Sequence, residues 1–158
     1  MNLSDIVHSD AIVTDLGASD RDAAIKRLLD AAIEAGAADA EIRDELLASI
    51  LDRESKGSTG FGRGVAIPHV KHERIREVKA AVGVSDQGID FNALDKQPVY
   101  SIFLLLSPQD EPETHLRAME VIFTNLSKET FRRLLRQAGS RDDVLTLLDD
   151  VDNQRLPS

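Results

Sequence analysis

Residues 58–72 read STGFGRGVAIPHVKH, a glycine-rich segment followed by a short apolar run, a proline and a histidine. Closely spaced glycines disfavour a helix in the first half of this stretch, because glycine leaves the backbone unrestricted. Residues 65–67 predict a short strand, and Pro68 predicts its end, because proline has no amide hydrogen for a sheet. His69 follows on a backbone that the proline ring restricts. The stretch therefore predicts a glycine loop and a strand with a histidine at its end.

Two helices are expected before this stretch, after an irregular start with one short strand in residues 5–16. Ser19 is the candidate N-cap of the first helix, and apolar residues recur at helical spacing up to Gly36. Asp39 is the candidate N-cap of the second helix, which ends with Arg53. The residues expected to face the core are Ala24, Ile25, Leu28, Leu29, Ala32 and Ile33 in the first helix and Ile42, Leu46, Leu47, Ile50 and Leu51 in the second.

Two longer strands are expected after the histidine, over residues 78–85 and 99–106. The segment 86–98 between them predicts a turn-rich connection with a short strand at its centre. The second long strand, VYSIFLLL, is apolar on both faces, which is typical of a central strand covered on both sides.

Three helices are expected at the C-terminal end. The first has Asp110 and Glu113 as a possible capping box and Pro112 at an early helical position, and the next two are expected to start at Ser127 and Ser140. The residues expected to face the core in the first of these helices are Leu116, Met119, Ile122, Phe123 and Leu126.

The order of elements predicts an α/β fold, a sheet with helices on both faces. A chain of 158 residues suits one compact domain, here 1–158 with a core of about 3–150. No repeat or linker is visible, and the tail NQRLPS is expected to be frayed.

Composition restricts the possible functions. The formal net charge of −9 disfavours nucleic acid and anionic membrane surfaces as partners, since both need a basic face. It favours either a protein partner with a basic patch or simple solubility. Cysteine is absent, so no thiolate site or disulfide is possible. Neither a signal peptide nor an apolar run long enough to cross a bilayer is visible.

The chain has four histidines. His8 and His72 lie among polar and charged residues and are interpreted as solvent-exposed. His69 is either a turn residue or a site where an anion forms on the imidazole, with backbone N–H groups of the glycine loop nearby. His115 begins an amphipathic helix, whose N-terminus stabilises negative charge, but a packing role is equally compatible. Arg53 either complements a helix dipole or anchors phosphate with its guanidinium group.

Other kinds of site were weighed against these. No GxxxxGK[ST] motif is present, and the glycines precede a strand instead of joining a strand to a helix, so nucleotide-binding loops are not indicated. His69 and His72, spaced i and i+3, could chelate a metal together with His115, although no ordered carboxylate pattern supports this.

Three segments together resemble a known family. RESKGSTGFGRGVAIPHVK is similar to the active-site motif of enzyme IIA of the bacterial phosphotransferase system, in its fructose–mannitol branch, whose typical form is STGIGxGxAIPHG. IDFNALDKQPVYSIFLLLSP and THLRAMEVI resemble two further blocks of that family in the same order. The resemblance covers roughly residues 3–150, with the free-standing nitrogen-regulatory enzyme IIA as the nearest likeness, because no permease, IIB or HPr-like segment is fused.

The resemblance implies a mixed central β-sheet flanked by helices and a cytoplasmic phosphotransferase without metal or cofactor. His69 matches the residue that accepts a phosphoryl group from an HPr-type phosphocarrier, and His115 and Arg53 match its active-site neighbours. The implied phosphoryl-binding groups are the hydroxyls of Ser58 and Thr59 and the backbone of the glycine loop, with Gly60 and Gly62. The implied acceptor is a IIB domain of a sugar permease, or else phosphorylation switches docking to a regulatory target protein.

Two residues depart from the family motif. Phe61 stands where isoleucine is usual, which exchanges one apolar side chain for another. Val70 stands where glycine usually follows the histidine, and its branched side chain restricts the backbone there. We therefore expect Val70 to affect the local geometry and the fit to a partner, but not the identity of the acceptor.

Overall fold

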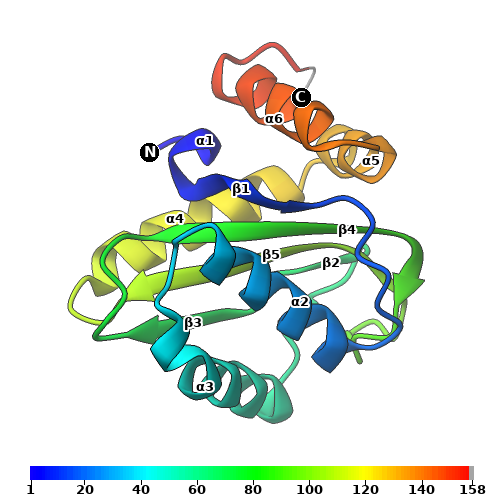
Figure 1. Cartoon of the computed structure of the whole chain (residues 1–158). Coiled ribbons are helices and arrows are strands. Elements are labelled where there is room, and N and C mark those ends of the chain that lie inside the picture. Colours follow the sequence, from blue (N-terminus) through cyan, green and yellow to red (C-terminus); the bar gives the residue numbers. More distant parts are fainter. Residues whose placement is uncertain (157–158) are drawn as a thin grey trace.

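A mixed β-sheet forms the centre of the computed structural model, which describes residues 1–156 (Figure 1). The sheet order is β1-β4-β5-β2, and β3 also pairs with β5. β1 is parallel to β4, β4 is antiparallel to β5, and β2 and β3 are both parallel to β5. The predicted α/β class with a mixed sheet is therefore confirmed. The strands are β1 (Val7–Val13), β2 (Val65–Ala66), β3 (His69–His72), β4 (Lys79–Ile89) and β5 (Val99–Pro108).

Helices cover both faces of the sheet. In Figure 1, α2 and α3 lie on one side, and α1, α4, α5 and α6 lie on the other. The bounds are α1 (Leu3–Ile6), α2 (Arg21–Glu34), α3 (Arg43–Lys56), α4 (Pro112–Leu126), α5 (Glu129–Gln137) and α6 (Arg141–Asp152), with a short 3-10 helix, η1 (Ala40–Ile42), before α3. None of the helices in the described part of the chain is both long and apolar enough to cross a membrane.

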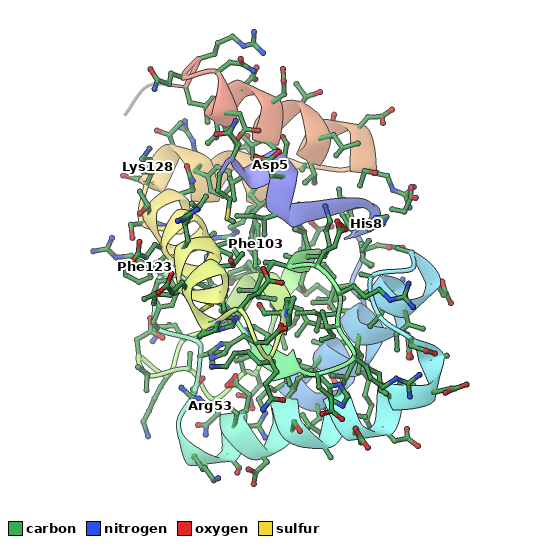
Figure 2. The ribbon with its side chains drawn as sticks, turned by 90° about the vertical axis from the view of Figure 1, so that its left-hand side faces the viewer. Asp5, His8, Arg53, Phe103, Phe123 and Lys128 are labelled. Carbon is green, nitrogen blue, oxygen red and sulfur yellow. The ribbon has the colours of Figure 1, made fainter. Side chains whose placement is uncertain are left out.

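Strand β5 separates two hydrophobic cores, as its apolar sequence predicts. Ile102, Leu104 and Leu106 belong to the core under α2 and α3, whereas Phe103 and Leu105 belong to the core under α4–α6. Successive side chains of a strand point to opposite faces, so a strand buried on both sides needs apolar residues throughout. Figure 2 shows Phe103 deep inside the molecule, beside α4.

Strand β2 ends before Pro68, as predicted, but a further strand that was not predicted follows the proline at the same edge of the sheet. β2 pairs with Ser101 and Ile102, and after Ile67 and Pro68 the chain pairs with β5 again as β3. Proline lacks a donor but keeps its acceptor, and the carbonyl of Pro68 accepts a hydrogen bond from Leu105 N at 2.9 Å. The sheet edge therefore continues past the proline, and His69 is the first residue of a strand.

Strand β4 is longer than predicted. It continues to Ile89, which pairs with Val99, and a register irregularity separates this end from Val84. The separate short strand expected within 86–98 is therefore the end of β4. Gly88 lies at this irregularity with φ +85°, and a Cβ there would lie 2.8 Å from Pro98 Cβ, so glycine is needed for the backbone to turn.

The helix ends match the prediction in part. Ser140 caps α6 through its side chain, as expected, and Asp39 caps η1, which leads into α3. Asp20, not Ser19, caps α2, because its carboxylate is the side chain that accepts from Ala23 N. The predicted tail 153–158 begins where α6 ends, and its residues 157–158 lie outside the described part of the chain.

The start of α4 was predicted in part and that of α5 wrongly. Pro112 is the first residue of α4, as expected. Glu111 precedes α4 without a side-chain cap, so the expected capping box from Asp110 does not form. Ser127 belongs to the end of α4, where its Oγ donates to Phe123 O, and Lys128 precedes α5. A serine hydroxyl can bond a carbonyl one turn back as well as cap the next helix, and sequence alone does not decide between these.

Candidate active site

His69 occupies the start of β3, with its side chain partly buried. Val70 belongs to the core under α2 and α3, so the alternation of the strand directs His69 and Lys71 toward α4 on the opposite face. His72 returns to the α3 face, where its Nε2 lies 2.6 Å from Glu45 Oε2. Strand geometry therefore separates the two histidines that are three residues apart.

The backbone determines which ring nitrogen of His69 is free. His69 Nδ1 lies 2.9 Å from the carbonyl oxygen of Ile67. A carbonyl can only accept, so Nδ1 must carry the proton and donate it. In the neutral ring, Nε2 is then left with its lone pair. The turn at Ile67 and Pro68 thus positions the histidine ring and selects its tautomer.

His115 lies beside His69. The two ring centroids are 5.5 Å apart, and the planes are tilted by 54°. His115 belongs to the first turns of α4 and is buried, with a side-chain hydrogen bond of 2.6 Å between its Nδ1 and Ser107 Oγ. Burial lowers the pKa of His115 to about 4, and the charges of His69 and Lys71 act in the same direction. His115 is therefore neutral near pH 7.

The end of α3 connects to the glycine loop through two side chains. Arg53 Nη1 donates to Gly57 O at 2.6 Å. Glu54 is only 3% exposed. Its Oε2 accepts from the amide of Thr59 at 2.9 Å, and its Oε1 accepts from the hydroxyl of Thr59 at 2.7 Å. Hydrogen bonds to a charged group contribute about 1.5–3 kcal/mol each, so Glu54 holds the loop firmly. Glu54 was not singled out from the sequence, where it looks like one acid among many.

An open pocket of about 380 Å³ lies in front of His69. Arg53, Thr59 and His69 contribute polar groups from one side, and α4 contributes the other wall, which includes the polar side chains of Glu120 and Thr124. The remaining lining residues are Phe61, Ile67, Met119, Glu120, Phe123 and Thr124. The structure therefore brings together three of the predicted site residues in one pocket and places His115 against the ring of His69.

The other predicted phosphoryl-binding residues lie outside the lining of this pocket. Ser58 Oγ accepts from the amide of Gly60 at 3.0 Å, and the donors of Thr59 are already bonded to Glu54. A Cβ on Gly60 would lie 2.9 Å from Ala93 Cβ, so glycine avoids a steric clash there, whereas Gly62 has φ +117°, which favours glycine for its backbone conformation. Phosphoryl binding by Ser58, Thr59, Gly60 and Gly62 stays a prediction.

Two aromatic side chains form the outer rim of the pocket. Phe61 and Phe123 pack with ring centroids 4.9 Å apart. Phe123 is 50% exposed, and Leu116 on the same helix is 59% exposed, so neither is the core residue that helical spacing predicted. In Figure 2, Arg53 and Phe123 lie toward the same side of the molecule, and His8 lies toward the other.

The histidines away from the pocket have local partners. His8 Nδ1 accepts from Asp10 N, and His72 bonds with Glu45 and with Arg74 N. The metal-binding alternative required His72 beside His69 and His115, but His72 lies on the opposite face of the sheet. Within residues 1–156, no group of three or more histidine and carboxylate side chains is arranged to hold a metal ion.

Comparison with known proteins decides the family. Residues 5–151 match the family described as phosphoenolpyruvate-dependent sugar phosphotransferase system, EIIA 2. The chain belongs to this EIIA family. The chain is 36% identical to the fructose-specific EIIA component of Haloferax volcanii over 131 residues, which cover 83% of this chain and 84% of the relative. The nitrogen regulatory protein of Escherichia coli is 41% identical over 107 residues, 66% of this chain and 64% of the relative.

Further matches cover most of the chain. The nitrogen regulatory protein of Bradyrhizobium diazoefficiens is 31% identical over 148 residues, covering 94% of this chain and 95% of the relative. The solved structure of nitrogen regulatory protein IIA-Ntr from Neisseria meningitidis superposes with a TM-score of 0.81 at 26% identity, covering 91% and 97% of the two chains. The enzyme IIA of the E. coli mannitol system, solved in complex with phosphorylated enzyme IIB, shares the fold with a TM-score of 0.75 at 20% identity, covering 89% and 94%.

The fold explains the unusual valine of this EIIA protein. Val70 pairs with Leu106 in β3 and is 8% exposed, packed in the core under α2 and α3. A branched side chain suits a strand and adds apolar burial at this position. The expectation that Val70 affects local geometry thus takes a specific form: valine is part of the strand that carries His69.

Proposed function

We propose that this EIIA protein accepts a phosphoryl group on Nε2 of His69 from a phosphorylated HPr-type carrier. The hydrogen bond between His69 Nδ1 and Ile67 O is the observation that supports this most strongly. It leaves Nε2 as the free nucleophile, on a ring that borders the open pocket. The phosphoryl group is then passed to a IIB domain of a sugar permease or is kept as a regulatory signal.

The proposed step is an in-line displacement at phosphorus. The lone pair of His69 Nε2 attacks while the bond between phosphorus and the carrier breaks, and the carrier keeps that electron pair. The ring gains positive charge as the new N–P bond forms, and the carbonyl of Ile67, which accepts from Nδ1–H, stabilises this charge. Positioning and electrostatics therefore supply the catalysis, as is general for phosphoryl transfer.

Arg53 and His115 are the proposed partners of the phosphoryl oxygens. The guanidinium group of Arg53 uses one nitrogen for Gly57 O and has further N–H donors, and a planar fork of donors matches phosphate geometry. Neutral His115 can donate one hydrogen bond from a ring that lies next to His69. Thr59 faces the same pocket and supplies a hydroxyl once its bond to Glu54 is exchanged. The proposed step needs no metal or cofactor, and we propose that it takes place in the cytoplasm together with its carrier.

Phosphorylation in vitro tests the assignment. Incubation with phosphoenolpyruvate, enzyme I and HPr is expected to add one phosphoryl mass that acid removes. His69→Ala should abolish the adduct, because Nε2 of His69 is the only proposed nucleophile. His72→Ala is the matched control, since His72 lies on the same strand but faces α3, and it should be labelled like the wild type. Labelling that survives His69→Ala would refute the assignment.

A regulatory role is the second candidate function. The similarity to nitrogen regulatory proteins, which extends over 94% of this chain in one case, favours it. In that role the charge added at His69 controls docking to a target protein, instead of moving on to a sugar. Transfer from the phosphorylated protein to a panel of IIB domains separates the two: rapid transfer to one domain supports transport, and failure with every domain supports regulation.

A further inference from the structure

Ser107 is a buried polar residue behind the active site. It lies near the end of β5, opposite Lys71 of β3, and its side chain is fully buried. Its Oγ lies 2.6 Å from His115 Nδ1 and has no other hydrogen-bond partner among residues 1–156. Ser107 therefore contacts the second histidine on the side away from the free ring nitrogen.

This hydrogen bond has two possible directions. If the hydroxyl donates to Nδ1, the serine proton is hydrogen-bonded and Nδ1 is the acceptor. The neutral ring then carries its own proton on Nε2. If Nδ1 donates to the hydroxyl instead, the proton of the fully buried serine has no acceptor among the described residues, and His115 Nε2 is bare. An unmade hydrogen bond of a buried group is strongly unfavourable, so the first direction prevails. The low pKa of His115, about 4, keeps the ring neutral and leaves these two states as the alternatives.

We propose that Ser107 is a positioning residue that holds His115 in the Nε2–H tautomer, so that this ring donates a hydrogen bond to the phosphoryl group on His69. The inference rests on the proposed function of His69. It makes the two histidines complementary: the carbonyl of Ile67 leaves His69 Nε2 bare for attack, and the hydroxyl of Ser107 leaves His115 Nε2 protonated for donation. In the opposite tautomer, a lone pair of His115 would face the phosphoryl oxygens and repel them.

The tautomer can be measured on the unphosphorylated wild-type protein. A protonated and a bare ring nitrogen give well-separated 15N resonances, so a histidine-selective 15N–1H correlation spectrum near pH 7 reports both rings directly. The expected result is Nδ1–H for His69 and Nε2–H for His115. A spectrum with His115 as Nδ1–H overturns the proposal, whether or not the protein accepts a phosphoryl group.

Substitution of Ser107 tests the role in transfer. Ser107→Thr and Ser107→Val introduce side chains of nearly the same shape, in which threonine has a hydroxyl group where valine has a methyl group. Ser107→Val is expected to lose the single His115 tautomer and to slow phosphoryl acceptance from phosphorylated HPr by about tenfold, because the donor is present only part of the time. Ser107→Thr should restore the Nε2–H tautomer and most of the rate relative to the valine variant.

Ser101 provides a matched control. It lies on the same strand and the same face, is buried, and its Oγ has no hydrogen-bond partner among the described residues. Ser101→Ala should leave both the His115 resonances and the rate unchanged. If Ser107→Val keeps the wild-type tautomer and rate, Ser107 does not position His115. If the wild type shows no His69-dependent labelling at all, the proposed function fails, and the tautomer measured by NMR still decides what Ser107 does.

Discussion

At the scale of single residues, the two neighbouring histidines of the candidate site have different surroundings. His69 is partly exposed to a pocket and bonds a backbone carbonyl, whereas His115 is buried and bonds a serine. Burial penalises the charged form of His115, while the carbonyl beside His69 favours a proton on Nδ1. These different environments underlie the roles that we propose, the nucleophile for His69 and the hydrogen-bond donor for His115, although the two side chains are chemically identical.

The low pKa of His115 predicts a loss of stability in mild acid. The unfolded chain binds a proton at His115 below about pH 6.5, but the folded chain does so only below about pH 4, so the unfolded state is favoured as pH falls between these values. We expect this group to lower the free energy of unfolding by about 1–2 kcal/mol between about pH 7 and pH 5.

Urea unfolding of the wild type and His115→Gln at both pH values measures this effect. The glutamine variant removes the titrating group, and other groups titrate equally in both proteins. The fall in stability should therefore be smaller in the variant. Equal falls in the two proteins would show that His115 has no lowered pKa.

At the scale of elements, the histidine strand and the helix above it create the site. β3 resumes pairing after Pro68 and directs His69 toward α4, and α4 presents His115 from its first turns. Glu54 at the end of α3 holds Thr59, so three elements meet at the pocket. The exposure of Phe123 and Leu116 shows that α4 buries only part of its apolar surface against the sheet.

Val70→Gly tests whether β3 depends on its valine. The side chain is packed in the core, and glycine also raises the flexibility of the strand, so we expect a loss of about 2–4 kcal/mol in the free energy of unfolding. Val70→Ala, which keeps a Cβ, should lose less. Denaturant unfolding measures both. A glycine variant as stable as the wild type would mean that β3 gains nothing from the branched residue.

At the scale of the whole molecule, the two ends of the described chain pack together. α1 contacts α6, and Figure 1 shows them side by side on the outer layer of the fold. The carboxylate of Asp152 accepts hydrogen bonds from the backbone amides of Leu3 and Ser4, at 3.0 and 3.2 Å. A side chain near the end of α6 thereby satisfies free donors at the start of α1.

Removal of this contact should destabilise the protein without affecting the site. Asp152→Ala leaves the amides of α1 without their acceptor, and we expect a loss of about 1–2 kcal/mol in the free energy of unfolding. Asp150→Ala is the control: Asp150 bonds Arg155 at the surface, and exposed ion pairs contribute about 0–1 kcal/mol. Both variants should accept a phosphoryl group on His69 like the wild type. Equal stability of the two variants would contradict the proposed link between the ends.

Local patterns in the sequence were sufficient for much of the fold. Helical spacing identified the core faces of α2 and α3, and the predicted cap at Ser140 is confirmed, whereas the serine caps predicted at Ser19 and Ser127 are not. The apolar run of β5 indicated a strand covered on both sides. Pro68 marked the end of β2, but β3 after it was not predicted, because the carbonyl of Pro68 still accepts from Leu105 N and pairing with β5 resumes.

The sequence by itself determined the main helices and long strands in their order, the family and the candidate histidine, because these depend on residues close together in the chain. It missed the short elements α1 and β3. The tertiary structure decided what surrounds that histidine. Pairing with β5 makes residues 69–72 a strand, whose alternation turns His72 to the α3 face. Helix α4 brings the ring centroid of His115 to 5.5 Å from that of His69, and β5 places Ser107 against His115 Nδ1. These contacts join residues far apart in the chain, and no local pattern encodes the distance between them. The exposure of Phe123 on α4 was likewise not predictable, because helical periodicity identifies an apolar face but does not show what packs against it.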